Sequence, residues 1–303
     1  MELGFFDIFA LPFMARALAT LAVLAVAAGI IGIGISFREL EFLSDGLVHA
    51  VFPGLVLGAM VGGNAGLLPG ALIAGVIAAV LFVLLGSGGH GGHGGRGRDR
   101  DAAIAVVLTG LFSLGIVLVS RQHGYVAQLQ DLLFGHLLTV TAVQFWQLVV
   151  VAIIAIGIVL VTLRAQLFRA FDPVGFAAAG FSTRATDLTL TIAVALLTVV
   201  GVQALGVLMV VALLVVPMAV SRLVTPRFAL LIPVAIVVPL LAGVGGLWLS
   251  FDWSLRTDAT VSPGALVVLL LVLGYALAVV AARLVAAPRT LLRQPQHGAE
   301  PRA

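Results

Sequence analysis

The chain has 303 residues, of which 62% are apolar and 10% charged, and its mean hydropathy is +1.23. A soluble domain carries about 25% charged residues, so this composition excludes an ordinary cytosolic enzyme and indicates a multi-pass membrane protein. All 16 basic residues are arginine. Because lysine is absent, the chain has no G-x-x-x-x-G-K-[ST] phosphate loop and is not itself a P-loop ATPase. Cysteine is also absent, which excludes disulfides and thiolate metal sites.

Apolar runs separated by short polar gaps predict about nine membrane-spanning helices, within a range of eight to ten, at roughly 20 residues per span. No segment alternates with the two-residue period of a membrane β-strand, so an all-α polytopic bundle is expected. The expected spans are 13–35, 46–62, 66–85, 102–120, 143–163, 188–202, 203–221, 228–249 and 263–284.

The arginines predict the orientation of these spans. If the N-terminus lies outside, the cytoplasmic loops and the C-terminal tail together hold 13 of the 16 arginines. This asymmetry follows the positive-inside rule and places the C-terminus inside. We therefore expect one transmembrane domain over residues 1–285 and a disordered cytoplasmic tail over 286–303.

The segment 86–101 is rich in glycine and contains His90, His93 and several arginines. It predicts a flexible cytoplasmic loop. Two histidines on a glycine tether form no rigid site, so the loop is either a weak metal-binding element or a solvated linker.

A carboxylate and an imidazole stand at the start of an otherwise apolar span. Asp45 and His49 are four positions apart, which puts them on one face of a helix. A charged residue inside a membrane costs about 3 kcal/mol, so such a residue usually faces a cavity or a partner. The pair suits a first-row divalent ion, and an incomplete ligand set fits a transport station. Alternatively, Asp45 is an N-cap and the pair only caps the helix.

A second polar segment, Gln128–Thr141, is too polar for a full span and predicts a short re-entrant or interfacial helix. It contains Asp131 and His136, which are five positions apart and therefore on poorly matching helical faces. These two residues form a weaker candidate site. His123, in the preceding outer loop, is interpreted as a solvated residue.

The segment Phe42–Gly54 resembles the F-x-x-D-x-x-x-H-A-x-x-x-G signature of membrane permeases of zinc, manganese and iron ATP-binding-cassette (ABC) importers. Further stretches agree with that family in order and spacing, and the resemblance covers roughly residues 14–284. The first of these stretches runs from Leu133–Gly135 through Val140–Thr141. The second runs from Gly206–Leu208 through Pro217 and Ser221–Leu223, and the third is the outer loop before the last span.

The resemblance implies a permease subunit in a bacterial plasma membrane, moving a divalent metal inward without binding a cofactor of its own. It also implies that the partners of the chain are a second copy of the permease, two cytoplasmic ATPase subunits and an extracytoplasmic metal-binding protein. Membrane lipid surrounds the chain, and no nucleic acid is expected as a partner. Asp45 and His49 match the metal-contacting residues of the family, and His136 is a candidate for a second station.

The resemblance further implies a coupling segment, which docks into the ATPase, in the cytoplasmic loop over 164–187. Asp172, Pro173 and Gly180 fit the pattern of that segment. Val174 and Phe176 depart from it, because an acidic residue and an alanine are usual at those positions.

Two alternatives remain at this point: an ion-gradient-coupled secondary metal transporter and an intramembrane metal-dependent hydrolase. The chain lacks the H-E-x-x-H and G-x-S-x-G motifs, which argues against the hydrolase. Asp and His accept zinc, manganese and iron alike. The histidines in the 86–101 loop favour zinc.

Overall fold

The computed structural model describes residues 5–86, 96–120, 133–257 and 261–291, and within these ranges it contains helices and no strand. Eight of the helices are long and apolar enough to cross a membrane. This confirms the predicted all-α multi-span bundle. The elements are α1 (Phe5–Phe9), α2 (Pro12–Phe37), α3 (Glu41–Ala50), α4 (Phe52–Gly86), α5 (Arg96–Val119), the 3-10 helix η1 (Leu137–Thr139), α7 (Ala142–Phe171), α8 (Pro173–Ala178), α9 (Thr183–Leu205), α10 (Val207–Val224), α11 (Phe228–Thr257) and α12 (Pro263–Leu291).

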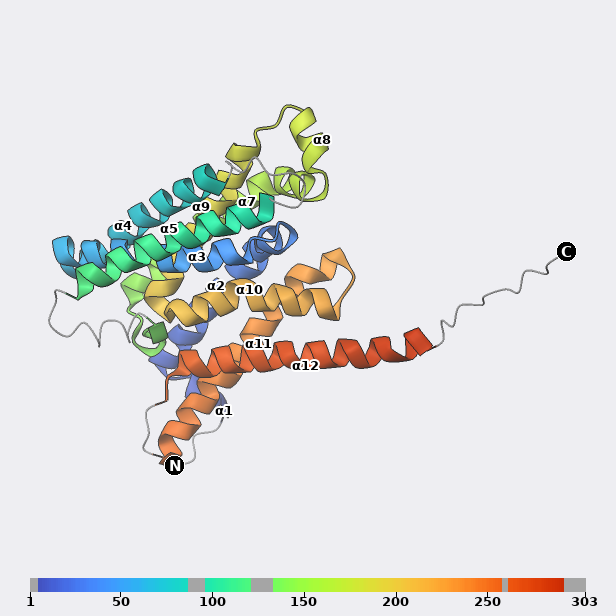
Figure 1. Cartoon of the computed structure of the whole chain (residues 1–303). Coiled ribbons are helices and arrows are strands. Elements are labelled where there is room, and N and C mark those ends of the chain that lie inside the picture. The colour runs from blue at the N-terminus through green and yellow to red at the C-terminus, as the bar shows by residue number, and fades with distance from the viewer. Residues whose placement is uncertain (1–4, 87–95, 121–132, 258–260, 292–303) are drawn as a thin grey trace.

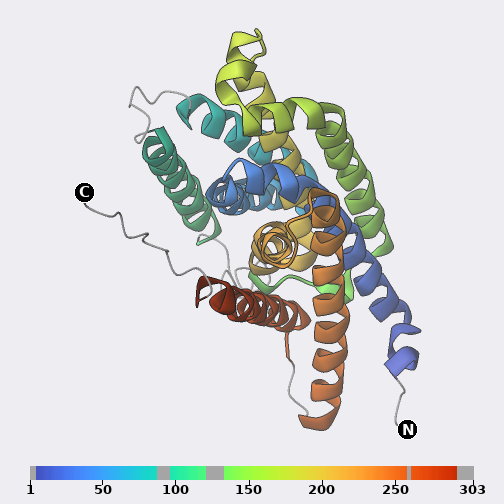
Figure 2. The same cartoon turned by 90° about the vertical axis from the view of Figure 1, so that its right-hand side faces the viewer.

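The centre of the bundle is formed by α2 and α9, the most deeply buried of the long helices, whereas α5 and α12 are the most exposed. Helix α2 packs against α7, α9, α10 and α11 (Figure 1). Helix α3 lies near the middle when the bundle is viewed along its length, with α5 and α10 on either side of it (Figure 2). Helix α3 therefore packs against several different helices.

Helix α4 contains a sharp reversal at Gly63, whose backbone angles (φ 55°, ψ −141°) are non-helical and favour glycine. The two arms pack glycine against glycine, because Gly58 faces Gly66 and Gly54 faces Gly70 so closely that a Cβ would overlap the opposite backbone. Such contacts bring helix backbones together in a membrane. Counted as two arms, this segment supplies the predicted spans 46–62 and 66–85 and brings the number of spans to nine within the described ranges.

The helices extend beyond the predicted spans at several ends. The expected loop over 164–187 is mostly helical, since α7 continues to Phe171 and α9 begins at Thr183. Helix α5 already begins at Arg96, and α12 continues through Leu291 into the expected tail. Hydropathy detects only the lipid-buried part of a helix, whereas the hydrogen-bonded backbone continues into the polar boundary.

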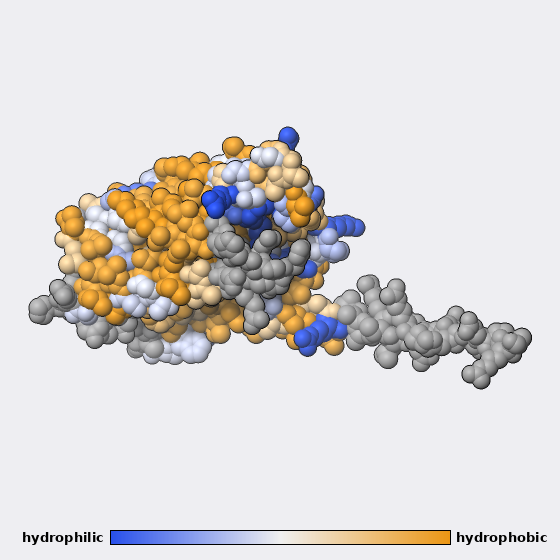
Figure 3. Space-filling view, turned by 45° about the horizontal axis from the view of Figure 1, so that its top comes forward, coloured by the Kyte–Doolittle hydropathy of each residue, from blue (hydrophilic) through white to orange (hydrophobic). Residues whose placement is uncertain are grey.

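The surface of the helices is broadly apolar, and hydrophilic residues gather toward the end of the bundle that carries α8 (Figure 3). Large apolar side chains such as Val161 and Ile73 are exposed on it. A soluble monomer rarely exposes apolar patches of this extent, so this surface fits a lipid environment.

Candidate functional site

Helix α3 has one buried face and one accessible face. Leu43, Leu47 and Val48 are almost fully buried. Gly46 lies against Ile104 of α5 and Phe82 of α4, and an added Cβ there would crowd both side chains. The small residue thus lets α3 seat closely on its neighbours. This packing fixes the rotation of the helix and sends Asp45 and His49 to the other face.

The two candidate ligands are adjacent. His49 Nδ1 lies 3.0 Å from the backbone carbonyl oxygen of Asp45 and 3.6 Å from Asp45 Oδ1. A carbonyl oxygen only accepts, so this hydrogen bond requires the proton on Nδ1, and in the neutral imidazole the lone pair is then on Nε2. The side chains of His49 and Asp45 are 28% and 38% exposed. Both side chains of the pair are therefore left partly uncovered by the helices that pack on α3.

The capping interpretation of Asp45 is wrong. Helix α3 begins at Glu41, one turn earlier, and its N-cap is Leu40, which makes no side-chain cap. Asp45 thus lies inside the helix, where its carboxylate is not needed by the backbone. The structure also shows a residue that the sequence analysis missed: Glu41 is partly exposed and lies four positions before Asp45 on the same helical face. The repeated four-residue spacing of Glu41, Asp45 and His49 is the signal that could have found it.

The ring of Phe112 on α5 meets the ring of His49 edge-on, with centroids 5.5 Å apart and an interplanar angle of 79°. The imidazole is therefore held on one side by an aromatic contact and on another by the helix backbone. Both contacts restrict its rotamers, which helps to keep Nε2 pointing in one direction.

His136 lies apart from this pair in the chain's described portion. It is exposed, precedes η1 and follows Gly135, whose backbone packs tightly against Gly206 at the α9–α10 junction. No group of three or more His, Cys, Asp or Glu side chains comes together among the described residues. The Asp45–His49 pair is thus an incomplete ligand set within one chain. Asp131, His123, His90 and His93 lie outside the described residues.

The predicted coupling segment contains a short capped helix, α8. Asp172 Oδ1 accepts a hydrogen bond of 2.7 Å from the backbone N–H of Gly175, and Pro173 occupies the first turn. Both are typical of a helix start. Gly180 follows the helix with φ 81°, a left-handed conformation that glycine adopts without strain.

Phe176, one of the two departures from the family pattern, forms the core of this segment. It is fully buried, and its ring centroid lies 5.4 Å from that of Phe168 on α7 and 5.0 Å from that of Phe181. Val174, the other departure, is 78% exposed. The segment is therefore anchored to α7 by aromatic packing and presents Val174 outward.

Comparison with known proteins identifies the family. The model of the ABC 3 transport family matches residues 10–282. The chain belongs to the ABC 3 transport family. It is 30% identical over 258 residues to the manganese transport system membrane protein MntC of Halalkalibacterium halodurans, covering 85% of each chain. It is 28% identical to the chelated iron transport system membrane protein YfeD of Yersinia pestis, covering 80% of this chain and 78% of that protein.

A solved structure of PsaBC from Streptococcus pneumoniae in complex with Fab has the same fold, with a TM-score of 0.75, 23% identity, and coverage of 90% of this chain and 94% of that chain. As a member of the ABC 3 transport family, the chain is a multi-pass transport permease of the bacterial plasma membrane and not an enzyme, and ATP is hydrolysed by a separate subunit. Membership argues against both alternatives, the gradient-coupled carrier and the intramembrane hydrolase.

Proposed function

We propose that the chain is the permease through which an ABC importer brings a divalent transition metal into the cytoplasm, with manganese as the first candidate. The relatives support this choice, because MntC of Halalkalibacterium halodurans is named for manganese and YfeD of Yersinia pestis for chelated iron. Zinc was favoured on the basis of His90 and His93, which lie outside the described residues. Manganese therefore replaces zinc as the first candidate.

The partly exposed Asp45–His49 pair on α3 supports the proposal most strongly. Removing the hydration shell of a divalent ion in a low-dielectric bundle requires anionic or imidazole ligands. Two protein ligands, supplemented by water or by another chain, bind the ion loosely enough for release. In the proposed assembly, two copies of the permease enclose the path, two ATPase subunits bind at the α8 side and an extracytoplasmic protein delivers the ion.

The test uses a strain that lacks this gene and is complemented with wild type, Asp45→Asn, His49→Gln or Asp252→Asn. Cellular manganese, iron and zinc are measured by mass spectrometry after growth under metal limitation. Wild type and the Asp252→Asn control, which removes a charge from an ion pair with Arg256 within α11, should restore manganese, whereas the two site variants should not. Restoration by both site variants, or no change in any metal with wild type, would contradict the proposal.

A further inference from the structure

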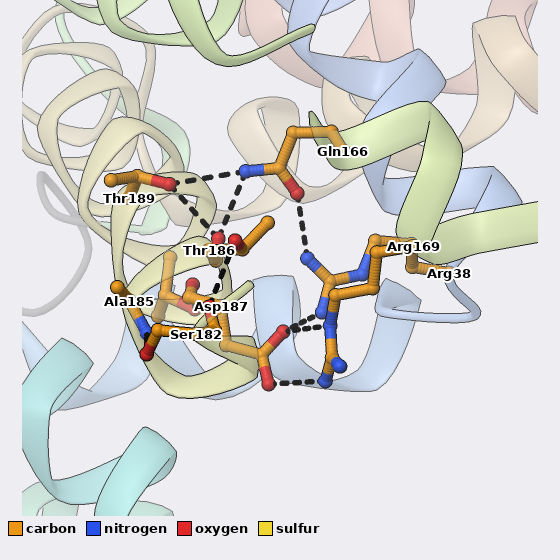
Figure 4. Close-up of polar contacts among 9 residues, drawn as sticks. Arg38, Gln166, Arg169, Ser182, Ala185, Thr186, Asp187 and Thr189 are labelled. Atoms are coloured by element: carbon orange, nitrogen blue, oxygen red, sulfur yellow. Dashed lines mark hydrogen bonds and ion pairs between the residues drawn. The ribbon is translucent and has the colours of Figure 1, made fainter. Parts of the chain in front are cut away.

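The three-residue turn between α2 and α3 is bound to α7 and α9 by Arg38. The side chain of Arg38 is 6% exposed, and its guanidinium forms an ion pair with Asp187 on α9 and donates a hydrogen bond of 2.7 Å to Gln166 Oε1 on α7 (Figure 4). One side chain therefore joins the end of α2 to both helices that flank α8.

Asp187 is shared by two arginines, Arg38 in the α2–α3 turn and Arg169 on α7. Arg169 of α7 donates to it through Nε at 2.8 Å and through a terminal nitrogen at 2.6 Å, in a bidentate pair (Figure 4). Gln166 adds hydrogen bonds of 2.9 Å to the Thr186 carbonyl oxygen and 3.1 Å to Thr189 Oγ1. Charge-assisted bonds of this kind are short and directional, and breaking them leaves a buried charge without a partner.

The network is continuous with α8. Arg169 directly follows Phe168, whose ring packs on the buried Phe176 of α8. Side-chain contacts therefore connect α8 with the end of α7, Asp187 and Arg38.

Hydrogen bonds on both sides hold the backbone of this turn in place. Glu39 has φ 53°, an uncommon conformation for a non-glycine residue, and the N–H of Leu40 bonds back to the Ile35 carbonyl oxygen at 2.9 Å. The guanidinium of Arg222 on α10 donates hydrogen bonds to the carbonyl oxygen of Ser36, at 3.1 Å, and to the hydroxyl oxygen of Ser36, at 2.9 Å. Helix α3 begins at Glu41, so only Glu39 and Leu40 separate Arg38 from the helix that carries Asp45 and His49.

We propose that Asp187 and Arg38 are positioning residues that transmit movement of α8 to α3, and thereby couple ATP hydrolysis to metal movement at Asp45 and His49. This inference rests on the proposed metal transport. The two residues act through α3 and do not touch the ion. An ion pair that only stabilised the fold would lower ATP turnover and uptake together, whereas a coupling link changes their ratio.

The experiment uses the complete permease–ATPase complex reconstituted in lipid vesicles with its binding protein and Mn²⁺. Uptake of Mn²⁺ and ATP hydrolysis are measured on the same vesicles, and Mn²⁺ binding is measured on the purified complex. Asp187→Asn keeps the shape of the side chain and removes its charge. We expect Mn²⁺ transported per ATP to fall about fivefold or more, within the range of coupling between sites, while Mn²⁺ binding is unchanged.

Asp252→Asn is the matched control, because it removes the same charge from an ion pair with Arg256 within α11 and should leave the ratio unchanged. Arg38→Lys is the second variant and decides the outcome if Asp187→Asn does not assemble. It retains the charge but cannot contact Asp187 and Gln166 together as a guanidinium does, so it should lower the ratio as well.

An unchanged ratio in the assembled variants, including a parallel loss of uptake and ATP turnover, would overturn the inference. Failure of Arg38→Lys to assemble as well would also overturn it, because the network would then be needed for the fold itself. If the wild-type complex hydrolyses ATP but moves no Mn²⁺, the proposed manganese transport fails instead, so the two failures are distinguishable.

Discussion

The imidazole of His49 is hydrogen-bonded through Nδ1 to the backbone carbonyl oxygen of Asp45, at 3.0 Å, and not primarily to the Asp45 carboxylate, which lies 3.6 Å away. This arrangement follows from four-residue spacing on a helix, where the side chain of one residue reaches back over the preceding turn. It leaves two independent ligand groups, Nε2 and the carboxylate, instead of a closed ion pair. The local geometry thus favours binding of a third species.

The role of Asp172 can be separated into capping and charge. Asp172→Asn keeps an acceptor for the Gly175 N–H and removes the charge, whereas Asp172→Ala removes both. We expect Asn to retain metal-stimulated ATP turnover in the reconstituted complex. Ala should lower it, because losing an N-cap costs about 1 kcal/mol and frays α8. Equal losses in both variants would show that the charge itself contacts the partner.

Phe176 should hold α8 to the bundle. Because the side chain is fully buried and packs on Phe168 and Phe181, Phe176→Ala should cost about 3 kcal/mol locally and speed amide hydrogen exchange over 174–178. Exchange in the core helices should not change. Val174→Ala is the control at an exposed position and should leave exchange as in wild type. Unaltered protection in Phe176→Ala would refute the aromatic anchor.

Gly58 should be intolerant of a methyl group, since its Cβ would overlap the carbonyl oxygen of Gly66 across the α4 hairpin. Gly58→Ala should cost about 1–3 kcal/mol by forcing the arms apart and should lower the melting temperature in detergent. Gly62→Ala, near the reversal, meets open space and is the matched control. Equal melting temperatures for the two variants would contradict the close packing of the arms.

Much of the fold was predictable because a lipid-spanning helix must be long and apolar. The pair of Asp45 and His49 on α3 was predictable because a four-residue spacing is a local feature of the sequence. The reversal at Gly63 fits the predicted gap between two spans, yet the pairing of Gly58 with Gly66 requires the folded arms. The Arg38–Gln166 contact joins residues 128 positions apart and carries no local signal. Phe176 departs from the family pattern, and only the packing shows that it forms the core of the α8 segment.

The topology, with the N-terminus outside and the C-terminus inside, stays a prediction from the arginine distribution. In Figure 1 the α10–α11 turn, α8 and the C-terminal end of α12 lie toward the same end of the bundle. That grouping is the one the positive-inside rule expects for cytoplasmic segments.

Pulsed electron paramagnetic resonance of Mn²⁺ bound to the purified permease–ATPase complex tests the Asp45–His49 station most directly. An imidazole nitrogen bound to Mn²⁺ gives a nitrogen coupling. We predict this coupling in wild type and in the His136→Gln control, its loss in His49→Gln, and weakened Mn²⁺ binding in Asp45→Asn. A nitrogen coupling that persists in His49→Gln, with Mn²⁺ affinity unchanged in Asp45→Asn, would show that the ion binds elsewhere.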